Sequence, residues 1–112
     1  MSLPAVPDNV RPDAPLIVFA KIIAKPGKAD ELGQAINICV EKSNKEPGTL
    51  IYTILRQLDQ PDTFLAYEKY ENLAAFKEHG KGEALKELVS KNLAAGLELN
   101  YTQDIQGFKS KI

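Results

Sequence analysis

One segment near the start of the chain, LIVFAKIIAK at residues 16–25, limits the possible folds more than any other. It is rich in β-branched residues, which predicts a strand. Successive side chains of a strand point to opposite faces. Here both sets are largely apolar, with Leu16, Val18, Ala20, Ile22 and Ala24 on one face and Ile17, Phe19 and Ile23 on the other. We therefore expect this strand to be covered on both faces.

The rest of the chain alternates between helical and strand-like patterns. The pattern predicts a helix at 29–46, strands at 49–59 and 63–71 joined as an antiparallel hairpin, helical segments at 73–80 and 82–96, and a strand at 97–108. This β-α-β-β-α-β order is that of the split β-α-β, or ferredoxin-like, α+β domain. It predicts a four-stranded antiparallel sheet with helices on one face.

One layer of helices leaves the second face of the sheet open. We first suppose that the open face carries Tyr52, Ile54, Phe64, Ala66 and Tyr70, although periodicity does not say which face the helices take. Such an apolar surface would exceed the ~300–600 Å² usual for a monomer. Two sheets packed face to face would bury it, so we expect a homodimer that closes a barrel.

Residues 1–15 contain four of the seven prolines, which disfavours regular structure. We expect an extended arm at 1–15, either mobile or lying along a neighbouring subunit, and one domain at 16–112. The net charge of −1 indicates neither a nucleic-acid nor a membrane partner. No apolar run reaches the ~18 residues of a membrane span, and no secretory signal is visible, so we expect a cytoplasmic protein. One histidine and one cysteine cannot form a usual zinc site, so we expect no metal.

Two segments resemble a known family. FAKIIAKPGKADEL, at 19–32, and EPGTLIYTILRQLDQPDTFLAYEKYENLAAFKEH, at 46–79, are similar to the antibiotic biosynthesis monooxygenase domain of the dimeric α+β barrel superfamily. The likeness covers residues 16–108. It implies a homodimer with a small-molecule pocket between sheet and helices in each subunit. It also implies that the segment 103–109 reaches across to the partner.

Members of this superfamily differ in their chemistry. Some oxidise phenols or quinols to quinones with O2 and no cofactor, a sister group degrades haem, and another isomerises a phosphorylated sugar. The haem-degrading group uses an asparagine and a tryptophan where this chain has Ala20 and Tyr70, which disfavours that reaction. The leading hypothesis is a cofactor-independent monooxygenase for a phenolic or quinol-like small molecule. The alternatives are an isomerase or ring-opening enzyme, or a non-catalytic, stress-related module that binds small ligands.

Two residues are candidates for proton transfer. Glu68 lies two residues before Tyr70 on a predicted strand, so the two share a face. If that face lines the pocket, burial raises the pKa of Glu68 and makes it a proton acceptor; otherwise it pairs across the hairpin with a residue such as Arg56. His79, the only histidine, follows Phe76 by three residues. It either acts as a general base at the pocket or is a structural residue at the helix end.

The remaining candidates are substrate contacts. They are polar or aromatic residues of the predicted strands, namely Tyr70, Tyr52, Phe64, Tyr101 and Asn100. Tyrosines at such positions more often pack against the core with the hydroxyl exposed to water. Tyr67 has the opposite parity to Tyr70, so the two cannot face the same cavity without a bulge.

Overall fold

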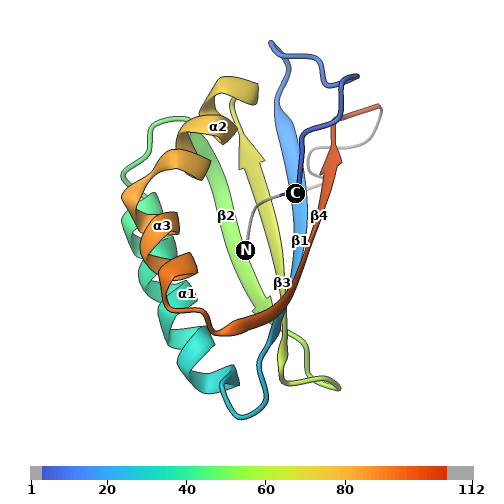
Figure 1. Cartoon of the computed structure of the whole chain (residues 1–112). Helices are drawn as coiled ribbons and strands as arrows, with labels where there is room; N and C mark the ends of the chain where they lie inside the picture. Colours follow the sequence, from blue (N-terminus) through green and yellow to red (C-terminus); the bar gives the residue numbers. More distant parts are fainter. Residues whose placement is uncertain (1–3, 106–112) are drawn as a thin grey trace, which may run out of the picture.

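A computed structural model describes residues 4–105 of the chain. Its elements are β1 (Leu16–Ala24), α1 (Ala29–Ser43), β2 (Thr49–Arg56), β3 (Thr63–Tyr70), α2 (Leu73–Lys81), α3 (Glu83–Ser90) and β4 (Ala94–Thr102). The four strands form one antiparallel sheet in the order β2-β3-β1-β4, and the helices form a layer beside it (Figure 1). The predicted ferredoxin-like α+β fold is confirmed.

The register of the sheet decides which side chains are neighbours. Glu68 of β3 lies between Val18 of β1 and Tyr52 of β2, and Tyr101 of β4 lies on the other side of Val18. Residues directly opposite each other on antiparallel strands point to the same face. These four side chains therefore share one face, at the middle of the sheet.

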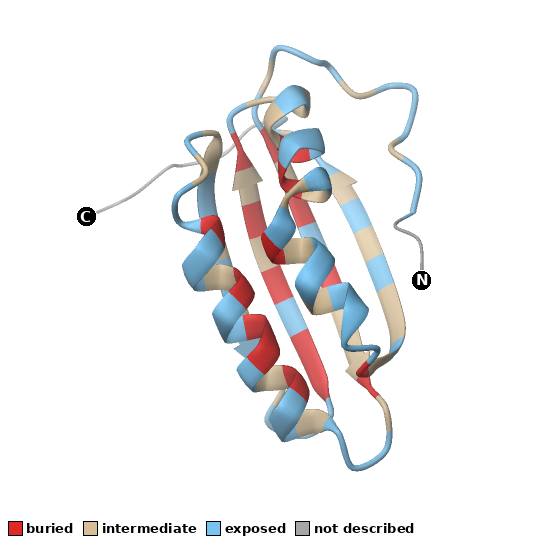
Figure 2. Cartoon of the chain, turned by 60° about the vertical axis from the view of Figure 1, so that its left-hand side comes forward, coloured by how far each residue is buried: buried red, intermediate tan, exposed pale blue. Residues whose placement is uncertain are grey.

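That face is the one covered by the helices, so our first supposition about the open face is wrong. Figure 2 shows the helices lying across one side of the sheet, and Phe64, Ala66 and Tyr70 are buried there. The apolar stripe of α1, which includes Leu32 and Ile36, packs against Phe64 in one core cluster. β1 is apolar on both faces, so its own sequence does not distinguish them. The opposite parity, which we had left possible, is the open one.

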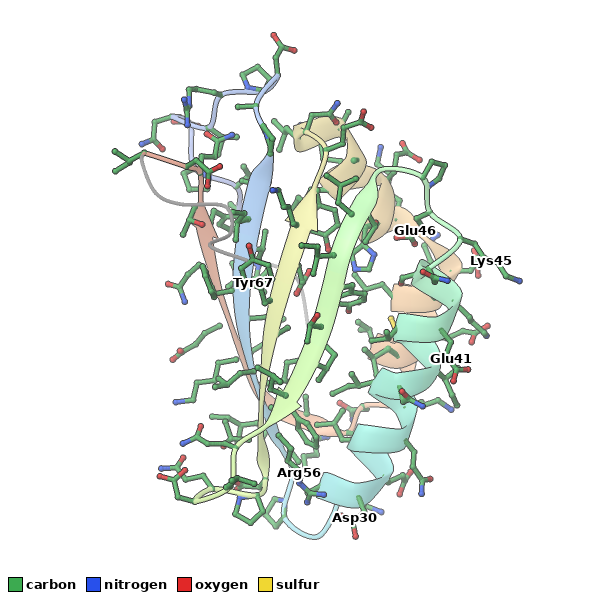
Figure 3. The ribbon with its side chains drawn as sticks, turned by 180° about the vertical axis from the view of Figure 1, so that it is seen from behind. Asp30, Glu41, Lys45, Glu46, Arg56 and Tyr67 are labelled. Carbon is green, nitrogen blue, oxygen red and sulfur yellow. The ribbon has the colours of Figure 1, made fainter. Side chains whose placement is uncertain are left out.

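The open face carries its own apolar surface. Its large exposed side chains are Phe19 (45% exposed), Leu65 (39%), Ile51 (40%) and Leu55 (55%). The rings of Phe19 and Tyr67 meet edge to face, with centroids 5.4 Å apart. Tyr67 points away from the helices in Figure 3.

The described part of the N-terminal arm, residues 4–15, packs against its own chain. Val6 and Val10 pack against a second core cluster formed by Leu16, Val18, Tyr70 and Phe76. The backbone N–H of Arg11 donates to the side-chain oxygen of Gln103 (2.9 Å), and the amide nitrogen of Gln103 donates back to the Arg11 carbonyl (2.9 Å). The arm therefore packs beside the C-terminal end of β4.

The boundary between the last helix and the last strand differs from the prediction. α3 ends at Ser90 and β4 begins at Ala94, so residues 94–96 are strand rather than helix. Asn92 adopts a left-handed φ of 53°, which ends helical geometry and turns the chain into β4. Residues 106–109 of the segment expected to reach a partner lie outside the described residues.

Candidate active site

A cavity of about 110 Å³ lies between the sheet and the helices α2 and α3. Most of its wall is aliphatic and includes Ile22, Leu32, Leu85, Leu88, Leu97 and Leu99. Its polar side chains are Tyr52, Glu68, His79 and Asn92. The register places Tyr52 beside Glu68, and the ring of His79 lies next to that of Tyr52, so these three polar groups lie together on one part of the wall.

Glu68 is a buried carboxyl group, only 6% exposed. It points towards the helices because its parity on β3 is that of Phe64 and Tyr70. The hydroxyl of Tyr70 donates to Glu68 Oε1. Burial raises the pKa of Glu68, while that hydrogen bond and the nearby His79 act in the opposite direction. The alternative pairing with Arg56 is not formed, because the register places Arg56 opposite Phe64 rather than Glu68. Arg56 instead donates to Asp30 Oδ1 at 2.9 Å (Figure 3).

His79 enters the site from α2. This helix begins at an N-cap, where Asn72 Oδ1 accepts a hydrogen bond from the Ala75 backbone N–H (2.9 Å). One helical turn after Phe76 the ring of His79 is 3% exposed, so it does not sit at the surface. Its centroid lies 5.0 Å from that of Tyr52 and 5.5 Å from that of Tyr70. The only histidine of the chain is thus enclosed by aromatic rings at the cavity.

Glu46 completes the site, and our sequence analysis did not select it. Its Oε1 lies 2.9 Å from His79 Nδ1 and also accepts a hydrogen bond from the Thr49 hydroxyl at 2.9 Å. Glu46 lies in the loop before β2, 33 positions from His79. The signal in the sequence was the Glu-Pro-Gly turn, which we used only as part of a family motif.

The phenols near the cavity act as hydrogen-bond donors rather than as bases. Burial raises the pKa of Tyr52 and of Tyr70, so both hydroxyls stay protonated at neutral pH. The Tyr52 hydroxyl lies 4.0 Å from Cys39 Sγ. Burial also raises the pKa of this thiol, which keeps it unreactive.

The predicted site residues divide into two groups. His79, Glu68 and Tyr52 line the cavity, and Tyr70 reaches it through its bond to Glu68. The other three predicted residues lie elsewhere. Phe64 belongs to the core under α1, Tyr101 packs against Phe76 and donates to the Pro4 carbonyl, and Asn100 is exposed on the open face opposite Phe19. Asn100 is displaced because it has the parity of the open face.

Residues 4–105 hold no cluster of three or more histidine, cysteine, aspartate or glutamate side chains able to bind a metal ion. Nor does any helix within that range combine the length and hydrophobicity needed to cross a membrane.

The fold and the cavity together define a ferredoxin-like α+β domain with a largely apolar cavity between its sheet and its helices. Residues 15–91 match the antibiotic biosynthesis monooxygenase family, and the chain belongs to this family. The matched range contains Glu46, Glu68 and His79, and ends shortly before β4 begins.

Similar proteins come from several bacteria. The uncharacterized protein sll1783 of Synechocystis is 29% identical over 90 residues, which cover 80% of this chain and 61% of that protein. A solved structure from Bacteroides thetaiotaomicron, which carries the name of the same family, has a TM-score of 0.79 and 24% identity, covering 88% of this chain and 97% of that one. PA3566 from Pseudomonas aeruginosa has a TM-score of 0.78 and 22% identity, with 86% and 99% coverage. These structures support the fold.

Proposed function

We propose that this protein is a cofactor-independent monooxygenase that oxidises a phenolic or quinol-like small molecule with O2 in the cavity. The observation that carries the proposal is that Glu68 and His79 both line one largely aliphatic cavity. An apolar chamber with a few polar groups is the usual form of a small-molecule site. Family membership supports oxygen chemistry over other reactions on the same scaffold.

The reaction begins with loss of the substrate's phenolic proton. His79 takes this proton, and the electron-rich phenolate transfers one electron to O2. Recombination forms a bond between oxygen and a ring carbon that still carries hydrogen. The resulting hydroperoxide loses water and leaves a quinone. One oxygen atom ends in the quinone and the other in water, and all four electrons come from the substrate, so no external reductant is needed.

The protein's contribution is positioning and desolvation. The aliphatic wall holds the ring of the substrate and excludes water, which strengthens every polar interaction inside. Burial raises the pKa of Glu68, which favours its protonated form, so this carboxyl group can pass a proton to the departing water. Tyr52, protonated and adjacent, orients the substrate oxygen.

We also propose that two copies pair through the open face of the sheet. Four large apolar side chains there, Phe19, Leu65, Ile51 and Leu55, are between 39% and 55% exposed. Exposed apolar side chains gathered on one face of a sheet favour association. A face-to-face dimer would give β1 the second cover that its sequence predicts, while the cavity lies on the other side of each sheet.

The test measures oxygen consumption by metal-stripped protein with a panel of one-ring phenols and quinols. We expect uptake with quinone formation, and a loss on the order of 10²- to 10⁴-fold in kcat for His79→Ala and Glu68→Gln. Glu78→Gln, a change at an exposed position next to His79, serves as the matched control and should retain full activity. Uptake no higher than in buffer would overturn the proposal. Turnover without O2 would indicate an isomerase, and ligand binding without turnover a binding module.

A further inference from the structure

We propose that Glu46 is a positioning residue that fixes the tautomer of His79, with the proton on Nδ1 and the lone pair on Nε2. The role in catalysis rests on the proposed function, whereas the tautomer itself is a property of the free protein. Nothing in the family match assigns this role, and the residue acts through His79 rather than on a substrate.

The hydrogen bond between the two residues sets the tautomer. An ionised carboxylate can only accept hydrogen bonds, so the imidazole nitrogen that faces it must carry the hydrogen. His79 Nδ1 lies 2.9 Å from Glu46 Oε1. The same oxygen accepts the Thr49 hydroxyl at 2.9 Å, which holds the carboxylate in place. Nδ1 is therefore the donor, and a neutral ring keeps its acceptor at Nε2.

The second ring nitrogen remains available to the cavity. Among the described residues, Nε2 of His79 has no hydrogen-bond partner. Every fully buried side-chain nitrogen of those residues does have a partner. Nε2 must then reach open space, and His79 lines the cavity. Tyr52 and Tyr70 flank the ring and restrict its rotation. The lone pair thus meets the space where a substrate hydroxyl would lie.

The backbone holds Glu46 close to α2. The Glu71 N–H donates to the Gly48 carbonyl at 2.9 Å, which ties the loop to the end of β3. At Gly48 a Cβ atom would stand 2.5 Å from the Cβ of Ala75, so only glycine allows the loop to approach α2 this closely. The Glu-Pro-Gly turn therefore brings a carboxylate from before β2 to a histidine on α2.

The tautomer matters because free imidazole favours the opposite one. In water a neutral histidine carries its proton mainly on Nε2, and such a ring in this cavity would present a donor to the substrate hydroxyl. It could not accept the phenolic proton without first rearranging. In the Ser-His-Asp triad of hydrolases, a buried carboxylate likewise holds the histidine in the tautomer that can accept a proton.

The test uses the fact that the chain has a single histidine. Protein labelled with ¹⁵N-histidine gives one imidazole spin system, and its long-range ¹⁵N–¹H correlation pattern at alkaline pH identifies the protonated nitrogen. We expect the Nδ1–H form in the unaltered protein. Glu46→Ala should convert the ring mainly to the Nε2–H form, Glu46→Gln should retain Nδ1–H because its amide oxygen also accepts, and Glu78→Gln should change nothing.

Kinetics then test the role in catalysis. Glu46→Ala should lower kcat by at least about 10-fold with little change in KM, and Glu46→Gln should recover part of the loss. An Nε2–H ring in the unaltered protein overturns the inference, and this measurement needs no variant to fold. A changed tautomer with unchanged kcat overturns the catalytic role. If the tautomer is as proposed but no phenol consumes O2, the proposed function fails while the assignment of Glu46 stands.

Discussion

The two faces of the sheet both carry aromatic and aliphatic side chains, but they differ in how their polar groups are placed. On the helix-covered face of β3, Tyr70 donates its hydroxyl to the buried Glu68. On the open face of the same strand, Tyr67 packs edge to face on Phe19 and is only partly buried. One face thus encloses a carboxyl group with its partner, and the other presents an aromatic surface.

This difference follows from desolvation. A carboxyl group taken from water requires a hydrogen-bond partner, and on the helix-covered face Tyr70 donates to Glu68. The open face contains apolar groups that lose little by exposure and gain by association. Chemistry is therefore expected on the covered face, and recognition of a second copy on the open one.

The largest effect on stability should come from truncating Tyr70, on the covered face of β3, in comparison with Tyr67 on the open face of the same strand. Tyr70→Ala removes a ring that is 0% exposed and leaves Glu68 without its partner, so we expect a loss of about 3–5 kcal/mol in the free energy of unfolding. Tyr67→Ala should cost less than about 1 kcal/mol within a protomer. Urea unfolding at one fixed protein concentration measures both. Equal losses would contradict the assignment of the two faces.

A charge on the open face should separate the proposed dimer. Phe19→Glu places a carboxylate beside Tyr67 on the open face, and we expect association to weaken by at least about 2 kcal/mol, or roughly 30-fold in Kd. Ile38→Glu is the matched control, because Ile38 on α1 is 46% exposed and Phe19 is 45% exposed. Sedimentation equilibrium compares the two variants. A stable dimer of Phe19→Glu would show that copies meet elsewhere.

The order of the elements was predictable because each periodicity is local. The stripe of Leu32, Ala35 and Ile36 reads as a helix, and the hairpin around the turn before Thr63 reads as two strands, without knowledge of the rest of the chain. The resemblance of residues 46–79 to one family added the location of a cavity. Glu68 and His79 were selected on that basis, and both line it.

The choice of the covered face was not predictable, because β1 and β3 present apolar residues on both sides. Asn100 has the opposite parity to Tyr101 on the same strand, and the register places it on the open face, away from the cavity. The pairing of Glu46 with His79 depends on how closely the loop approaches α2, which only the three-dimensional packing of Gly48 on Ala75 determines. Contacts between distant residues of this kind leave no periodic signal.

The smallest of these effects, and the most specific to the covered face, is the pH dependence of Glu68→Gln. Burial raises the pKa of Glu68 above its ordinary value of 4.5, so the folded protein binds this proton more tightly than the unfolded chain does. The bound proton stabilises the folded protein fully when the pH is below the ordinary pKa of 4.5. This stabilisation is lost as the pH rises through the raised pKa of the folded state. Glutamine remains neutral and can still accept from Tyr70.

We therefore expect Glu68→Gln to be more stable than the unaltered protein at neutral pH, by on the order of 1 kcal/mol, with the gap closing on acidification towards pH 4.5. Thermal unfolding of both proteins across this range measures the gap. Glu98→Gln, at an exposed position of the open face, should show no such trend. A gap of the opposite sign would mean that the folded protein favours the ionised Glu68 carboxylate. The hydrogen bond from Tyr70 and the charge of the nearby His79 would then outweigh the effect of burial on the pKa.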